Sequence, residues 1–253
     1  MAGAGAYIEP YYFVSASAAL AIALFFPVTR HMRERSDRRS YYFLQGITIL
    51  GAIVGAKLSA LVGDYHWPWR SVEDWRIILG SGRSITGALI GGFVAAELAK
   101  PLLGYTMPPN DRFAAVLPFS IGIGRIGCAL TGCCLGMPHA GALSVSYADG
   151  IARYPAQIIE AIFHFTAGVI FIWCVRKKLF FGRLFAVYLV VYGLFRFSTE
   201  FIRATPKDFG GYSAYQLFSA VMVILGAAFF VKRTVWRPKE WAAHKIGEEA
   251  MQI

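Results

Sequence analysis

Seven apolar runs, each close to the length needed to cross a lipid bilayer, limit what this chain can fold into. A transmembrane helix needs about 20 consecutive, mostly apolar residues. The runs are separated by short polar stretches, and they cover residues 11–28, 42–62, 84–103, 113–130, 155–175, 184–201 and 214–231. The sequence therefore predicts an all-α integral membrane protein of about seven transmembrane helices, built as a single domain over residues 1–253.

The composition supports a membrane protein over a soluble one. The chain is 57% hydrophobic and 16% charged, whereas soluble domains carry about 25% charged residues. The net charge of +10 by itself suggests a nucleic-acid partner, but the lysines and arginines cluster at the ends of the apolar runs. Basic residues in that position set the orientation of membrane helices. We therefore expect no nucleic-acid partner.

The basic clusters predict how the chain is oriented in the membrane. They fall in residues 30–39, 100–112, 176–178 and 232–239, which alternating helices place on one side. Loops rich in Lys and Arg face the cytoplasm, so we expect the N-terminus outside and the C-terminus inside. The first run lacks the basic flank of a cleavable signal, and we expect it to be retained as a span.

An arginine inside the fourth run is the first candidate functional residue. Arg125 is flanked by Gly122, Gly124 and Gly127, which allow another helix or a head group to come close to the backbone. A charge at membrane depth costs several kcal/mol unless it faces the bundle interior or a wet cavity. The alternative is that the side chain reaches along the helix to the outer interface.

The sixth run ends with a second set of charges. Arg196 and Glu200 are four residues apart, so they share one helical face, and Arg203 follows one turn later. Such a ladder can orient one guanidinium while another binds an anion, and phosphate fits guanidinium geometry best. A structural ion pair between helices explains the pattern equally well.

Two other segments have ordinary explanations when taken alone. SITGALIGG, residues 84–92, carries Gly87 in a small-residue face suited to close helix packing. RYPAQIIEA, residues 153–161, has Pro155 where a helix can begin, followed by Gln157 and Glu160.

Three cysteines lie at the outer edge of the fourth run. Cys128, Cys133 and Cys134, with His139 nearby, are compatible with a disulfide, a nucleophilic thiol beside Arg125, a metal site, or buried small hydrophobic residues. The spacing is poor for a metal, and we expect neither a metal nor a cofactor. Cys133 or Cys134 could also form a covalent intermediate or act as a base.

In this order and at these separations, the segments resemble the prolipoprotein diacylglyceryl transferase family of bacterial membrane enzymes. GRIGCALTGCCLG, residues 124–136, is similar to the family's glycine, arginine, any residue, glycine motif. RYPAQIIEA, YGLFRFSTEFIR and SITGALIGG resemble three further family segments, and IEPYYF near residue 8 resembles the N-terminal one. The resemblance spans nearly the whole chain.

The resemblance implies a reaction and a set of site residues. A diacylglyceryl group moves from phosphatidylglycerol to the thiol of a lipobox cysteine, and glycerol phosphate is released. Arg125 and Arg196 would contact the phosphate, and Glu200 would orient Arg196. Because burying three charges apart from one another is costly, we also expect these three side chains to converge on one polar cavity between the fourth and sixth runs. The predicted substrate-binding residues are Tyr11, Thr86, Gly87, Cys128, Cys133, Gly136, Gln157 and Arg203, with Gly136 closing the head-group pocket and Tyr11 bonding the head group.

The same resemblance implies partners and a location. The expected partners are phosphatidylglycerol or another anionic phospholipid, prolipoprotein signal peptides and a membrane protein complex. The expected location is the bacterial inner membrane, with the active face extracytoplasmic.

This chain departs from the family pattern at the positions that could accept a proton. Thr86 stands where the family has histidine, Cys128 and Cys133 where it has asparagine and glutamate, and Tyr154 where it has a second histidine. Threonine cannot take a proton from a thiol near neutral pH. A catalytically silent lipid-binding subunit or assembly factor is therefore the alternative to a transferase, and a thiol-redox membrane protein is a third possibility that the arginines disfavour.

Overall fold

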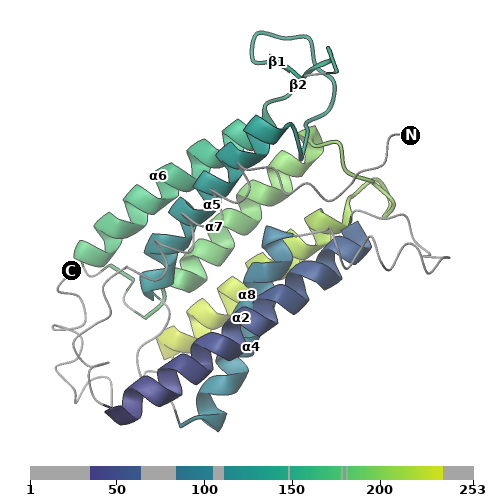
Figure 1. The fold of residues 1–253 in the computed structure, drawn as a ribbon. Helices are drawn as coiled ribbons and strands as arrows, with labels where there is room; N and C mark the ends of the chain where they lie inside the picture. The colour runs from purple at the N-terminus through teal and green to yellow at the C-terminus, as the bar shows by residue number, and fades with distance from the viewer. Residues whose placement is uncertain are drawn as a thin grey trace. The chain divides into compact units, whose positions relative to one another are not determined.

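The computed structural model describes residues 35–63, 84–104, 111–147, 149–177, 179–180 and 182–235. Six α-helices account for most of them (Figure 1): α2 Arg35–Gly63, α4 Ile85–Leu102, α5 Asp111–Thr131, α6 Ala156–Arg176, α7 Leu184–Thr199 and α8 Ala214–Val235. The other elements are the strands β1 Val145–Ser146 and β2 Ala152–Arg153 and the 3₁₀ helix η2 Glu200–Ile202. Each of the last six apolar runs is a helix, whereas the first run, with Tyr11, lies outside the described residues.

The six helices have the length and surface of membrane spans. Within the described ranges, six helices are long and apolar enough to cross a bilayer. On α2, Tyr42, Leu50 and Leu58 are 58–68% exposed. Such an apolar surface is unfavourable in contact with water and favourable in contact with lipid tails. These observations confirm an integral membrane protein.

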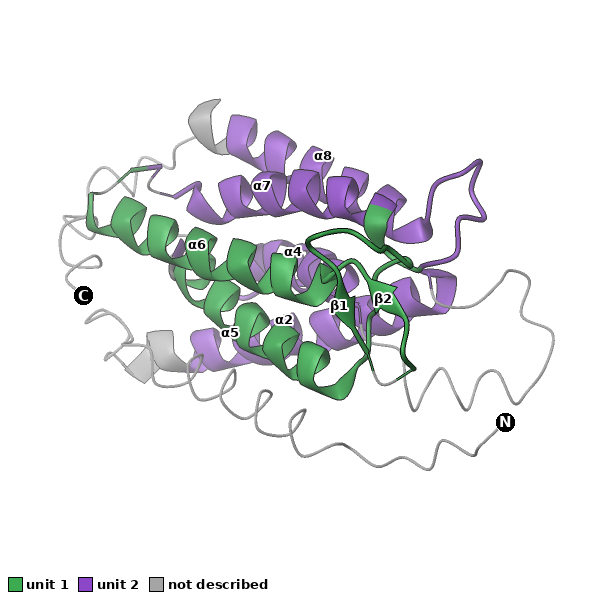
Figure 2. Cartoon of the chain, turned by 90° about the horizontal axis from the view of Figure 1, so that it is seen from above, with its two compact units in different colours: residues 1–27, 112–179, 202–204 green, residues 28–111, 180–201, 205–253 purple. Residues whose placement is uncertain are grey.

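The chain divides into two compact units that interleave along the sequence (Figure 2). Unit 1 contains α5, α6 and the β1–β2 hairpin, together with residues 202–204. Unit 2 contains α2, α4, α7 and α8.

Glycines bring α2 and α4 of unit 2 into close contact. A Cβ atom placed on Gly91 would collide with the main-chain oxygen of Gly51 and lie 2.9 Å from the Cα of Gly55. A Cβ on Gly87 would collide with the Ser59 hydroxyl. This confirms the close-packing face predicted for residues 84–92, because only glycine allows helix backbones to approach so closely.

Aromatic side chains fill the rest of the core of unit 2. Phe93 of α4 lies against Phe185 of α7 and Phe229 of α8, with ring centroids 5.6 and 4.7 Å apart. Tyr188 and Tyr192 are fully buried and stack at 5.9 Å. The Asp111 carboxylate accepts hydrogen bonds from the backbone N–H groups of Gly182 and Leu184, which satisfies donors left open at the start of α7.

Unit 1 is built on the packing of α5 against α6. Phe119 covers Gly168, and Phe165 covers Gly122, so each ring lies where a glycine leaves room. Beyond the end of α5 the chain turns at Gly132, whose φ is +67°. It then forms the antiparallel β1–β2 hairpin, in which Val145 is opposite Arg153, before α6 begins after Pro155 as predicted.

Candidate functional site

A buried carboxylate on α6 holds two guanidinium groups in unit 1. Glu160 Oε1 lies 3.0 Å from Arg125 Nη2, and its Oε2 lies 3.2 Å from Arg203 Nη1. Glu160 is 1% exposed, and the two arginines are 6% and 5% exposed. Arg125 therefore faces the protein interior, not the outer interface as the alternative reading supposed. Two guanidiniums sharing one carboxylate form a cationic centre suited to an anion such as phosphate.

Arg203 reaches this centre because α7 ends earlier than expected. We predicted that Arg203 would continue the helical ladder of Arg196 and Glu200, and this was wrong. The α-helix ends at Thr199, and η2 redirects the chain. The backbone of residues 202–204 then pairs with residues 135–137, through Met137 N–H to Ile202 O at 2.8 Å and Ala204 N–H to Leu135 O at 3.2 Å.

Gly136 is the bridge partner of Arg203 in this pairing. A Cβ atom at Gly136 would collide with the main-chain oxygen of Tyr154. Only glycine therefore lets three backbone segments meet beside Arg203.

Two further polar side chains of α6 lie near Glu160. Gln157, which is fully buried, donates a hydrogen bond to the Cys133 carbonyl and accepts one from the Tyr147 hydroxyl at 2.9 Å. His164 is fully buried as well, with Nε2 3.9 Å from Glu160 Oε1. Sequence reasoning missed Glu160 and His164 as site residues, although ionisable residues within an apolar run are themselves a signal of function.

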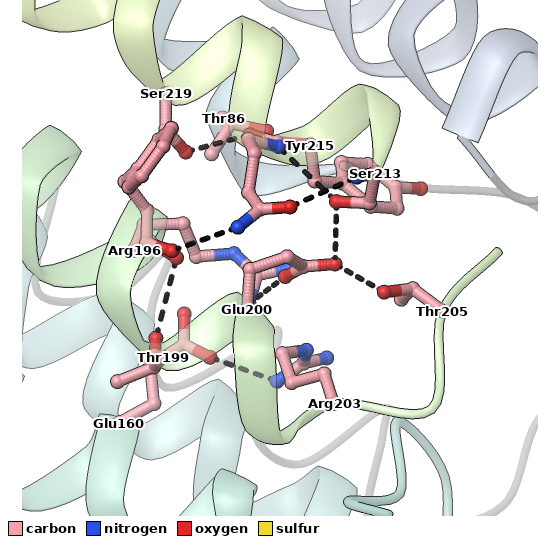
Figure 3. A network of polar contacts seen from close by, with 12 residues as sticks. Thr86, Glu160, Arg196, Thr199, Glu200, Arg203, Thr205, Ser213, Tyr215 and Ser219 are labelled. Atoms are coloured by element: carbon pink, nitrogen blue, oxygen red, sulfur yellow. Dashed lines mark hydrogen bonds and ion pairs between the residues drawn. The ribbon is translucent and has the colours of Figure 1, made fainter. Parts of the chain in front are cut away.

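In unit 2, Glu200 is the centre of a second polar network (Figure 3). Arg196 Nη1 lies 2.7 Å from Glu200 Oε2, which confirms the predicted pair. The other oxygen, Oε1, accepts hydrogen bonds from the hydroxyls of Thr205 and Ser213, the latter at 3.0 Å. Lys207 donates to the Glu200 carbonyl at 2.7 Å. Glu200 therefore fixes the position of the Arg196 guanidinium.

Thr86 lies at the start of α4 in the same unit. It is 1% exposed, and its hydroxyl is 2.8 Å from the hydroxyl of Ser84, the N-cap residue of the helix. Gly87 follows in the contact with α2 described above. The Thr86 hydroxyl can donate or accept a hydrogen bond here, but it cannot act as a general base.

The three cysteines after Arg125 gather at the end of α5. Cys128 is buried, Cys133 is half-buried and Cys134 is exposed, and their sulfur atoms all lie within 4.8 Å of one another. Hydrogen bonds from the Cys128 and Cys133 thiols lower the pKa of Cys134, and the charges of Arg125 and Arg203 lower it further. His139 stacks on Tyr154 with ring centroids 3.9 Å apart. It does not belong to the cluster formed by the three cysteine sulfurs.

The predicted site residues thus fall into two groups. Unit 1 holds Arg125, Cys128, Cys133, Gly136, Gln157 and Arg203, and unit 2 holds Thr86, Gly87, Arg196 and Glu200. Tyr11 lies outside the described residues. The convergence of Arg125, Arg196 and Glu200 on one cavity stays a prediction.

Comparison with known proteins finds one family across almost the full length. The family model described as "Prolipoprotein diacylglyceryl transferase" matches residues 8–232. A phosphatidylglycerol–prolipoprotein diacylglyceryl transferase of Clostridium tetani is 30% identical over 78% of this chain and 84% of the relative. A phosphatidylglycerol–prolipoprotein diacylglyceryl transferase 2 of Clostridium perfringens is 29% identical over 71% of this chain and 73% of the relative. A phosphatidylglycerol–prolipoprotein diacylglyceryl transferase of Campylobacter lari is 29% identical over 85% of this chain and 84% of the relative.

Proposed function

This chain belongs to the prolipoprotein diacylglyceryl transferase family, and from that premise we propose that it transfers the diacylglyceryl group of phosphatidylglycerol to the cysteine thiol of a prolipoprotein. The relatives carry both substrates in their names. The observation that carries the proposal is the pair of guanidiniums, Arg125 and Arg203, held on the buried Glu160.

The chemistry explains why fixed guanidinium groups are needed. The thiolate sulfur attacks the glyceryl carbon, the carbon–oxygen bond breaks, and a singly charged phosphodiester leaves as glycerol phosphate with a second negative charge. Guanidiniums already fixed in place stabilise that developing charge with little reorganisation. In this proposal Arg125, Arg196 and Arg203 contact the phosphate, while Glu160 and Glu200 orient them.

The membrane arrangement is part of the proposal. Seven spans place the N-terminus outside and the C-terminus in the cytoplasm, so that the active face is extracytoplasmic in the bacterial inner membrane. The basic clusters of the sequence support this orientation. The family match over residues 8–232 supports a single domain.

The competing function is a catalytically silent lipid-binding subunit or assembly factor. It is favoured by Thr86, whose buried hydroxyl bonds Ser84 and provides no proton acceptor. In that case the arginines bind an anionic phospholipid and no transfer follows.

Lipid retention by the purified full-length protein tests the binding step. Native mass spectrometry should show phosphatidylglycerol retained over zwitterionic lipid, with about ten-fold or greater loss in Arg125→Ala and Arg196→Ala, because a charge-assisted contact contributes about 1.5–3 kcal/mol. Arg176→Ala, which removes an exposed arginine at the end of α6, is the matched control and should retain lipid. Equal retention of phosphatidylglycerol by all variants would show that Arg125 and Arg196 only stabilise the fold and do not bind the lipid.

A second incubation separates enzyme from scaffold. The protein is mixed with labelled phosphatidylglycerol and a cysteine-containing lipobox peptide. Release of glycerol phosphate together with a lipidated peptide supports the transferase. Lipid binding without release supports the silent subunit.

A further inference from the structure

The cysteine cluster has a geometry that its sequence spacing conceals. Four residues separate Cys128 from Cys133, and Cys134 is adjacent, which is a poor metal-binding spacing. The chain nevertheless folds back on itself, because Gly132 and Cys134 adopt positive φ angles of 67° and 57° and the Cys133 N–H bonds the Cys128 carbonyl at 3.1 Å. The three sulfurs are thereby brought within 4.8 Å of one another.

These distances suit a thiolate metal site. Zinc–sulfur bonds of about 2.3 Å at tetrahedral angles place sulfurs about 3.8 Å apart, so small side-chain rotations are enough. The turn is also held from outside: Gln157 bonds the Cys133 carbonyl, and the Thr131 hydroxyl donates to Cys133 Sγ at 3.4 Å. Cys128 is buried, Cys133 is half-buried and Cys134 is exposed.

The surrounding charge favours a divalent ion. Thiolates select Zn²⁺ or Cu⁺ over hard cations. Zn²⁺ on three thiolates carries a net charge of −1. The charges of Arg125 and Arg203 act on Cys134, and together with their shared partner Glu160 these arginines carry +1. Before the acceptor binds, the combination is neutral with zinc, whereas with Cu⁺ it would already carry an uncompensated negative charge, which is costly in a partly buried site.

We propose that Cys128, Cys133 and Cys134 bind one Zn²⁺ ion and leave its fourth position for the acceptor thiol. Three protein ligands with one open position are the pattern of catalytic zinc sites. This proposal rests on the transferase function above and identifies how its acceptor is activated.

The step balances without any redox partner. The acceptor R–SH replaces a zinc-bound water and loses its proton to solvent, because a thiol that coordinates zinc is deprotonated. The sulfur then attacks the glyceryl carbon, so that an S–C bond forms, a C–O bond breaks, and glycerol phosphate leaves with the bonding electron pair. The thioether product is a weak zinc ligand and departs. Zinc thus does what Thr86 cannot do, since it generates the thiolate.

Metal binding by the purified full-length protein is the first test. Reduced, metal-free protein is titrated with Zn²⁺ against a chromophoric chelator, and with Co²⁺ to observe sulfur-to-cobalt charge-transfer absorption. We expect one ion per chain. Cys134→Ser, at the exposed position, should lower affinity at least ten-fold, whereas Cys174→Ser, on α6 outside the cluster, should not. Equal affinities in the wild type and Cys134→Ser, or no charge-transfer band, would overturn the site.

The acceptor position has a test of its own. Adding a lipobox peptide to the Co²⁺ protein should shift the absorption spectrum, and the same peptide with its cysteine replaced by serine should not. An unchanged spectrum with both peptides, or full transfer by metal-free protein, would overturn the role of zinc while leaving the transferase function standing. Conversely, a zinc-loaded protein that binds the peptide thiol but releases no glycerol phosphate would overturn the proposed transferase and leave the metal site in place.

Discussion

At the scale of single residues, the Glu160 carboxylate in unit 1 forms ion pairs with two arginines. Its two oxygens lie 3.0 and 3.2 Å from the guanidiniums of Arg125 and Arg203, and all three side chains are buried. Buried charges are tolerated only when they are paired with good geometry. Removing this one carboxylate charge therefore affects two arginines at once.

We expect Glu160→Gln to destabilise the protein by about 3 kcal/mol, because breaking a buried ion pair by removing one partner costs about 3–5 kcal/mol and the amide retains some hydrogen bonding. Thermal unfolding in detergent would show this as a lowered melting temperature. Asp149→Asn is the matched control, since Asp149 pairs with Arg153 at 2.9 Å on the exposed hairpin, and exposed pairs contribute little. Equal melting temperatures for the two variants would refute the central role of Glu160.

At the scale of secondary-structure elements, the contact between α2 and α4 depends on glycines at its centre. Main-chain atoms of Gly51 and Gly55 occupy the space where Gly91 would carry a Cβ atom. Backbone atoms cannot rotate away as a side chain can, so a methyl group there forces the helices apart.

Gly91→Ala should therefore destabilise the protein by about 1–3 kcal/mol, the usual cost of overpacking. Gly46→Ala on α2 is the matched control, because a Cβ atom there meets nothing within 4 Å. Alanine should leave stability unchanged or raise it by up to about 1 kcal/mol at that position. Unfolding of both variants in the same detergent checks the prediction, and a Gly91→Ala protein as stable as Gly46→Ala would contradict it.

At the scale of the whole molecule, orientation in the membrane decides which compartment the site serves. The basic residues that predict orientation lie between the apolar runs and at their ends, in residues 30–39, 100–112, 176–178 and 232–239. Lys and Arg in short loops resist translocation, which keeps those loops cytoplasmic.

A reporter enzyme fused after Lys239 should be active only on the cytoplasmic side. A truncated fusion after Leu143, in the loop between α5 and α6, should be active only outside and serves as the control. Activity of the Lys239 fusion outside the cytoplasm would show that the orientation is opposite to the predicted one, with the site on the cytoplasmic face.

The sequence by itself determined the features of this protein that depend on residues close to one another along the chain. Run length and composition were enough to predict the membrane helices from residue 42 onward, and the spacing of Arg196 and Glu200 was enough to predict their contact, because four residues make one helical turn. The glycine face of residues 84–92 was readable for the same reason.

Only the tertiary structure decided which charges and thiols meet across long distances in the chain. Arg203 contacts Glu160, 43 residues away in the sequence, because α7 ends before Arg203 and is followed by η2 and a backbone bridge to Gly136. The periodicity of a helix in the sequence does not show at which residue the helix ends. Glu160 looked like an ordinary helix start until the fold brought Arg125 to its other oxygen. Likewise, the three sulfurs meet because a turn with two positive φ angles closes between Cys128 and Cys134, and the spacing of cysteines along the sequence does not encode that geometry.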